Sequence, residues 1–104
     1  MIIKIVSVAE LGALAKLVRR DQSLDQETAG MLSGNGSTFI SRFENGKESC
    51  EIGRVLSLLR ELGMELEVNL PPNLSDNARR KILYRLSGLD NSTPDLAREL
   101  ELKE

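Results

Sequence analysis

The sequence predicts a small, mainly α-helical bundle with one β-strand and a helical C-terminal extension. Apolar residues recur at spacings of three and four through most of the chain, which is the period of an amphipathic helix. Residues 64–70 instead alternate between apolar and polar, which is the period of a half-buried strand. With 104 residues, of which 40% are hydrophobic, the chain suits one small domain. We therefore expect a helical domain over residues 1–70 and an extension over residues 71–104.

The first helix is predicted to begin after Ser7, whose hydroxyl can cap free amides while Glu10 reaches back. A second helix is expected to begin at the cap residue Asp25 and to end at Ser33-Gly34. Gly30 inside it indicates that another helix crosses very close by.

The third segment, "STFISRFEN", places its apolar residues Phe39, Ile40 and Phe43 on one side, and Asn45-Gly46 ends it. The second and third segments together therefore predict a helix, a tight turn and a helix. A fourth helix is expected after the cap Ser49, and Gly63 should end it in the left-handed region. Its predicted buried stripe consists of Ile52, Val55, Leu56, Leu59 and Leu62.

The strand predicted at 64–70 needs a partner, because a single strand leaves its backbone groups unpaired. Its apolar residues are Met64, Leu66, Val68 and Leu70. The partner is either the β-branched segment Ile2–Val6 or the same strand of a second chain. We favour the second chain, because that pairing buries both apolar faces and closes a two-fold dimer.

The extension is predicted to contain a helix capped by Ser75, with Ala78, Ile82, Leu83 and Leu86 on one face, ending at Gly88. Thr93-Pro94 then predicts the start of a last short helix, because Pro suits the first helical position.

Composition excludes several classes of function. The chain has no His, so neither a His-containing catalytic triad nor a His metal cluster is possible. The single Cys50 cannot form an internal disulfide, which points to a reducing, cytoplasmic setting. No segment has the length and apolarity of a membrane span, and the N-terminus does not resemble a signal peptide. A net charge of −2 means that any nucleic-acid binding must depend on a local face.

Catalytic motifs do not account for the glycines of "SGNGSTFISRFENGK". The GxGxxG pattern would need glycine at Phe39, and the P-loop pattern would need glycine at Ser41. Glu65 and Glu67 alternate along the predicted strand and should point to solvent. We therefore expect no enzyme activity, no cofactor and no metal.

The remaining signal is the helix-turn-helix. Its third segment can enter a DNA major groove, because the hydroxyls of Ser37, Thr38 and Ser41 can reach phosphates and base edges. Arg42 can reach a guanine or a phosphate, and Gln26 and Lys47 are placed to hold phosphates. The alternative is that all of these are ordinary surface residues of a small helical bundle.

The chain resembles the lambda-repressor-like (XRE) helix-turn-helix family over roughly residues 4–70. The marks are Leu24 before the cap, Gln26-Glu27, Ser33-Gly34 and "FISRFENGK". Within that family it is most similar to HipB-like antitoxins, through "KIVSVAELGALAKLVRR" before the motif and "RELGMELEV" after it.

The resemblance implies a dimeric repressor that is closed by a two-stranded sheet at 64–70 and binds palindromic operators of its own operon. It implies a HipA-type kinase toxin as the partner. It places base reading on Gly36, Ser37, Thr38, Ser41 and Arg42, and a phosphate contact on Gln26. The chain departs from the family at Asn35, at Gly30 and at Gly36, where the usual cap is missing, and it has no Trp in its tail.

Two other functions stay open at this point. One is a stand-alone regulator of the same fold without a toxin. The other is a protein-interaction module whose helix-turn-helix does not touch DNA.

Overall fold

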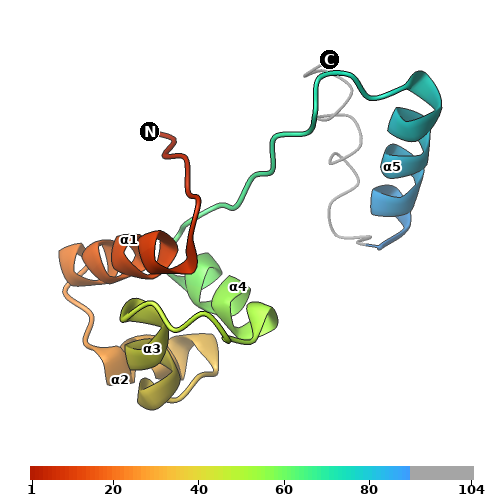
Figure 1. Ribbon diagram of the computed structural model, residues 1–104. Helices are drawn as coiled ribbons and strands as arrows, with labels where there is room; N and C mark the ends of the chain where they lie inside the picture. The colour runs from red at the N-terminus through yellow and green to blue at the C-terminus, as the bar shows by residue number, and fades with distance from the viewer. Residues whose placement is uncertain (90–104) are drawn as a thin grey trace. The chain divides into compact units, whose positions relative to one another are not determined.

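The computed structural model describes residues 1–89 and forms two compact units. The first, Met1–Glu67, holds α1 (Val8–Asp21), α2 (Gln26–Ser33), α3 (Ser37–Glu44) and α4 (Ile52–Glu61). The second begins at Val68 and holds α5 (Asp76–Leu89) (Figure 1). The last predicted helix, after Thr93-Pro94, lies outside the described residues. No helix among residues 1–89 is long and apolar enough to cross a membrane.

The starts of α1 and α2 confirm the predicted caps. The Glu10 backbone N–H donates to Ser7 Oγ at 3.1 Å, and Glu10 Oε2 accepts from the Val6 N–H at 2.8 Å. At α2, the Thr28 N–H donates to Asp25 Oδ1 at 2.7 Å. The bonds to Ser7 and Asp25 satisfy amides that the first turn of a helix leaves without a partner.

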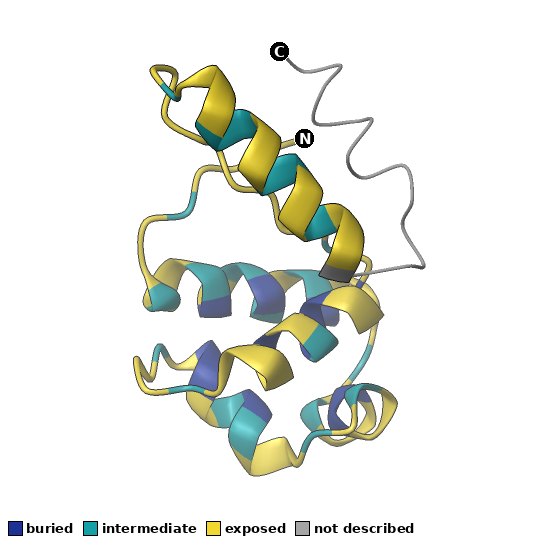
Figure 2. Ribbon diagram, turned by 90° about the vertical axis from the view of Figure 1, so that its right-hand side faces the viewer, coloured by how far each residue is buried: buried dark blue, intermediate teal, exposed yellow. Residues whose placement is uncertain are grey.

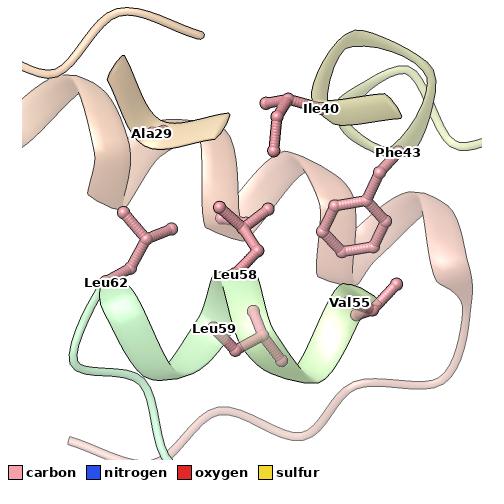
Figure 3. Close-up of a cluster of buried hydrophobic side chains, with 8 residues drawn as sticks. Ala29, Ile40, Phe43, Val55, Leu58, Leu59 and Leu62 are labelled. Atoms are coloured by element: carbon pink, nitrogen blue, oxygen red, sulfur yellow. The ribbon is translucent and has the colours of Figure 1, made fainter. Parts of the chain in front are cut away.

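The core of the first unit lies between all four of its helices. α2 packs against α3 and α4, and α1 packs against α3. In Figure 3, Ile40 and Phe43 of α3 lie opposite the side chains of α4, with Ala29 beside them. The buried apolar residues of the core are Ala15, Ala29, Ile40, Phe43, Val55, Leu58, Leu59 and Leu62. The predicted apolar side of α3 is thus the side that faces the core, which leaves its other side outward.

α4 differs from the prediction in its start and in its buried face. Ser49 does not cap it, because the helix begins at Ile52 after Glu51, and no side chain caps its first turn. Ile52 is 64% exposed and Leu56 is 38% exposed, whereas Leu58, which the predicted stripe omitted, is buried. The predicted set of buried residues and the observed set both follow helical spacing. The packing of α2 on α4 determines which of them is buried.

Two glycines allow backbone to approach a helix closely. A Cβ on Gly30 would lie 2.5 Å from the carbonyl oxygen of Asn35, so the predicted close approach is confirmed. The neighbour, however, is the turn after α2 and not a crossing helix. A Cβ on Gly12, which the sequence did not single out, would lie 2.1 Å from the carbonyl oxygen of Phe43.

α5 begins at its predicted cap, where the Ala78 N–H donates to Ser75 Oγ at 3.1 Å, and it ends one residue past Gly88. Its apolar residues Ala78, Ile82, Leu83 and Leu86 are half-buried, and the rest of the helix is mostly exposed (Figure 2).

Candidate nucleic-acid interface

α3 presents a polar surface to the outside of the first unit. Ser37, Thr38 and Arg42 are exposed and Ser41 is half-buried. On the opposite side, the ring of Phe43 is buried and stacks on that of Phe39, with ring centroids 6.4 Å apart. The buried side fixes the orientation of the helix, so the hydroxyls and the guanidinium group are held outward.

The turn between α2 and α3 is held by several hydrogen bonds. Gly34 adopts the left-handed conformation with φ of 74°, which glycine tolerates without strain. The Asn35 N–H donates to the Gly30 carbonyl at 2.7 Å. The Asn35 side-chain amide donates to Ser33 Oγ at 3.0 Å and to the Arg54 carbonyl at 3.2 Å. Asn35 therefore ties the turn to α4 by hydrogen bonds, in a position where the resembling family usually has an apolar side chain.

Gly36 is the N-cap of α3, and no side chain caps the helix there. A Cβ on Gly36 would have no atom within 4 Å, so the space in front of this end of α3 is open. The backbone at the start of the helix is therefore accessible from outside.

Gln26 is linked to α3 through a buried ion pair. Arg19 Nε donates to Glu44 Oε2 at 2.6 Å and Arg19 Nη2 donates to Glu44 Oε1 at 2.9 Å. Gln26 Nε2 donates to the same Oε1 at 3.0 Å, and Arg19 Nη1 donates to the Leu24 carbonyl at 2.6 Å. These bonds connect α1, the start of α2 and the end of α3. The half-buried Gln26 uses one N–H of its amide in this way, and a second N–H remains on the same nitrogen.

The carboxylate of Glu44 stays ionised in this network. Burial on its own raises the pKa of Glu44, but the hydrogen bonds from Arg19 and Gln26 outweigh it, so the pKa lies below its ordinary value. The hydrogen bond from Arg19 to Glu44 likewise raises the pKa of Arg19. Asp25, which caps α2, has a lowered pKa because the Thr28 backbone N–H donates to it.

Arg42 and Lys47 line one shallow depression beside α3. The Lys47 N–H donates to the Arg42 carbonyl at 3.0 Å, which holds the two residues next to each other. The depression is lined by Phe39, Arg42, Lys47, Ser49, Cys50, Glu51 and Arg54. Arg54, which sequence reasoning missed because it lies on the next helix, donates to Glu51 at 2.8 Å. Cys50 directs its thiol to the Lys47 carbonyl at 3.0 Å.

No protein-family model matches the chain. Among curated proteins, it is 37% identical over 68 residues to an uncharacterized HTH-type transcriptional regulator, y4mF, of Sinorhizobium fredii (strain NBRC 101917 / NGR234). That match covers 65% of this chain and 90% of the relative. The chain belongs to the HTH-type transcriptional regulators.

A solved structure described as "MDT Protein" agrees with the fold of this HTH-type regulator. It superposes with a TM-score of 0.62 at 25% identity, and the match covers 66% of this chain and 97% of the other. The pair α2 and α3, joined by the turn at Gly34, has the helix, tight turn and helix arrangement that the sequence predicted.

The predicted dimerising segment of the regulator has no regular secondary structure and forms no strand within residues 1–89. Residues 2–6 are not paired with it either. Met64 is half-buried and packs on the core, whereas Leu66, Val68 and Leu70 are 54%, 77% and 47% exposed. Met64 and Leu66 also line a shallow groove, whose other lining residues are Leu56, Leu59, Arg60, Gly63 and Glu65.

Proposed function

We propose that this regulator is a homodimeric, sequence-specific repressor that binds palindromic operator DNA through α3. We further propose that it is the antitoxin of a HipA-type kinase toxin and represses its own operon. The observation that carries the DNA-binding proposal is the outward hydroxyl side of α3, opposite a side locked into the core by Ile40 and Phe43.

α3 has the properties that reading a major groove requires. Ser37 and Thr38 are exposed in its first turn, and in helix-turn-helix proteins the N-terminal residues of the second helix contact base edges. The missing side chain of Gly36 lets the backbone approach the duplex closely. Ser41 and Arg42 follow one turn later, where the guanidinium can form two hydrogen bonds with a guanine.

Gln26 and Lys47 fit the role of phosphate contacts beside α3. The amide nitrogen of Gln26 is oriented by Glu44 and retains one N–H that can donate to a phosphate oxygen. Lys47 is exposed directly after α3 and contributes a positive charge. Phosphate contacts of this kind fix the position of the protein along the duplex, whereas contacts with the bases determine which DNA sequence it binds.

The proposed dimer joins the segments 64–70 of two chains as a two-stranded sheet. The exposed apolar side chains of Leu66, Val68 and Leu70 would be covered by the second copy. The groove beside Met64 and Leu66 extends this apolar surface onto α4 through Leu56. A two-fold dimer then presents two α3 helices to half-sites about 34 Å apart.

The antitoxin role is supported by the resemblance of "KIVSVAELGALAKLVRR" and "RELGMELEV" to HipB-like antitoxins. Co-expression with a HipA-type kinase encoded beside the regulator's gene tests it. We expect the two proteins to co-purify and the kinase to lose its toxicity. A neighbouring gene of a different kind, or a kinase that stays toxic, would support a stand-alone regulator instead.

The variant Ser41→Glu tests the assignment of α3. We expect it to lower affinity for duplex DNA from upstream of the regulator's own gene by at least about tenfold, because it places a carboxylate against phosphates. The control is Ser57→Glu, which makes the same change at a half-buried serine of α4. Gel shifts measure affinity and sedimentation confirms that the oligomeric state is unchanged. Equal affinity of Ser41→Glu and the unchanged chain would refute this role of α3.

A further inference from the structure

α5 concentrates positive charge that the rest of the chain does not have. It carries four cations, Arg79, Arg80, Lys81 and Arg85, against the single carboxylate of Asp76, a net charge of +3. The whole chain has a net charge of −2. The sequence up to Glu67, which holds the helix-turn-helix, has eight cationic and ten acidic side chains. The helix is therefore a local basic element on an otherwise acidic protein.

Three of the four cations lie on one face of α5, and Arg79 lies on the half-buried side. Arg80 and Tyr84 are one turn apart, as are Lys81 and Arg85, so these four residues are neighbours on the helix surface. All four are exposed, Tyr84 to 81%, and no ion pair joins Arg80, Lys81 or Arg85 to another residue of the described chain. The half-buried residues of α5 lie on the opposite side, and we name the exposed set Arg80, Lys81, Tyr84 and Arg85 the basic face.

We propose that the basic face binds the phosphate backbone of duplex DNA beside the site that α3 reads. The inference rests on the proposed function and adds a second DNA-binding element to it. Arg, Lys and Tyr side chains all donate hydrogen bonds to phosphate oxygens. A duplex carries one negative charge per about 1.7 Å of its axis, so a row of cations on a helix meets several phosphates at once.

The composition of the first unit explains why such an element is useful. Arg42 and Lys47 are the cations beside α3, and Arg54 in the same depression is paired with Glu51. A recognition surface with so few unpaired cations gains little affinity from its phosphate contacts. A tethered basic helix supplies the missing electrostatic attraction without changing which bases are read.

The chain between α4 and α5 is long enough for this. Fourteen residues, 62–75, separate the two helices, and fully extended they span about 46–50 Å. If residues 64–70 are held in a dimer sheet, the tether 71–75 and the part of α5 up to Arg85 still span about 32 Å together. The centre of each half-site lies about 17 Å from the two-fold axis, half of the separation of about 34 Å, so the basic face can reach DNA beyond it.

The double variant Lys81→Gln/Arg85→Gln of the full-length chain tests the proposal. Gln has a helix propensity close to that of Lys and Arg, so α5 should be retained, which circular dichroism checks. Fluorescence anisotropy measures the affinity for duplex DNA from upstream of the regulator's gene between 50 and 200 mM salt. We expect the slope of log affinity against log salt to become shallower by about 2 per chain, and affinity at 50 mM salt to fall by about tenfold or more.

The control is Lys4→Gln/Arg20→Gln, which removes one Lys and one Arg that are exposed elsewhere. Its slope should stay close to that of the unchanged protein. An unchanged slope in the α5 variant, or an equal change in both variants, would overturn the role of the basic face while leaving recognition by α3 intact. An unmodified chain that binds no duplex would overturn both proposals together.

Discussion

At the scale of single residues, the buried pair Arg19 and Glu44 is the most consequential feature of the first unit. Each side chain has 6% or less of its surface exposed, in a core otherwise built of apolar residues. Two hydrogen bonds join them, Gln26 donates a third bond to Glu44, and Arg19 donates another to the Leu24 carbonyl. A buried pair of this kind adds little net stability, because desolvation offsets most of the attraction. Its effect here is to hold three helices in one arrangement and to orient Gln26.

The lowered pKa of Glu44 predicts that this pair weakens in acid. A group whose pKa is lower in the folded state stabilises the fold above its unfolded value, and the contribution is lost as pH falls through the folded pKa. We therefore expect the free energy of unfolding in urea to fall between pH 7 and pH 3, starting near the ordinary Glu value of 4.5. The double variant Arg19→Met/Glu44→Met should lose less over this range.

A single and a double variant separate the cost of leaving one charge buried without a partner from the net contribution of the Arg19 and Glu44 pair. Glu44→Ala alone should cost about 3–5 kcal/mol at pH 7, because it leaves the Arg19 charge buried without a partner. The double variant replaces both charges with apolar groups and should recover most of that loss. An acid dependence as steep in the double variant as in the unchanged protein would show that other groups, such as Asp25, account for it.

Residue roles were only partly predictable from sequence. The caps Ser7, Asp25 and Ser75 followed from local chemistry, because their hydrogen-bond partners lie three residues away. The bond of Gln26 to Glu44 crosses 18 residues of sequence and left no local signal. Arg54 was missed for the same reason, since only the packing of α4 brings it to the depression beside Arg42.

At the scale of elements, close backbone contacts set where α3 sits. Gly12 of α1 meets the carbonyl of Phe43 at the end of α3, and Gly30 of α2 meets the turn that precedes α3. Each contact requires a residue without a Cβ. α3 is therefore positioned at its beginning by α2 and at its end by α1.

The variant Gly12→Ala should displace α1 from α3. Its Cβ would lie 2.1 Å from a backbone oxygen, so the helices must separate, at a cost of about 1–3 kcal/mol in stability. The control Gly53→Ala places its Cβ in open space on α4 and should stabilise the fold by about 0.5 kcal/mol. Thermal unfolding of both variants measures these effects. Equal stability of Gly12→Ala and the unchanged chain would contradict the close packing of α1 on α3.

At the scale of the whole molecule, the chain consists of a helix-turn-helix unit and a second unit with the basic helix α5. Segment 64–70, where the two units meet in sequence, is also the segment that we expect to join two chains. Dimerisation would pair two α3 helices and bring two basic faces to one operator. Affinity for DNA should therefore depend on residues that touch no DNA themselves.

The variant Val68→Pro tests the dimer. Proline removes a backbone donor and clashes with a paired strand, so we expect the chain to sediment as a monomer at concentrations where the unchanged protein is a dimer. Operator affinity should fall as well, because each monomer holds one half-site. Val68→Thr, which keeps a β-branched side chain, is the control and should remain a dimer. An intact Val68→Pro dimer would rule out pairing through this segment.

The sequence by itself determined where α1 begins, where α2 and α3 begin and end, and which side of α3 is apolar, because caps, glycines and periodicity act over a few residues. It also determined the helix-turn-helix, whose turn needs glycine at position 34. Only the tertiary structure decided that Leu58 rather than Ile52 and Leu56 is buried, and that Glu44 joins Arg19 to Gln26. Such choices depend on which helices meet, and contacts between residues distant in sequence leave no periodic trace in the chain.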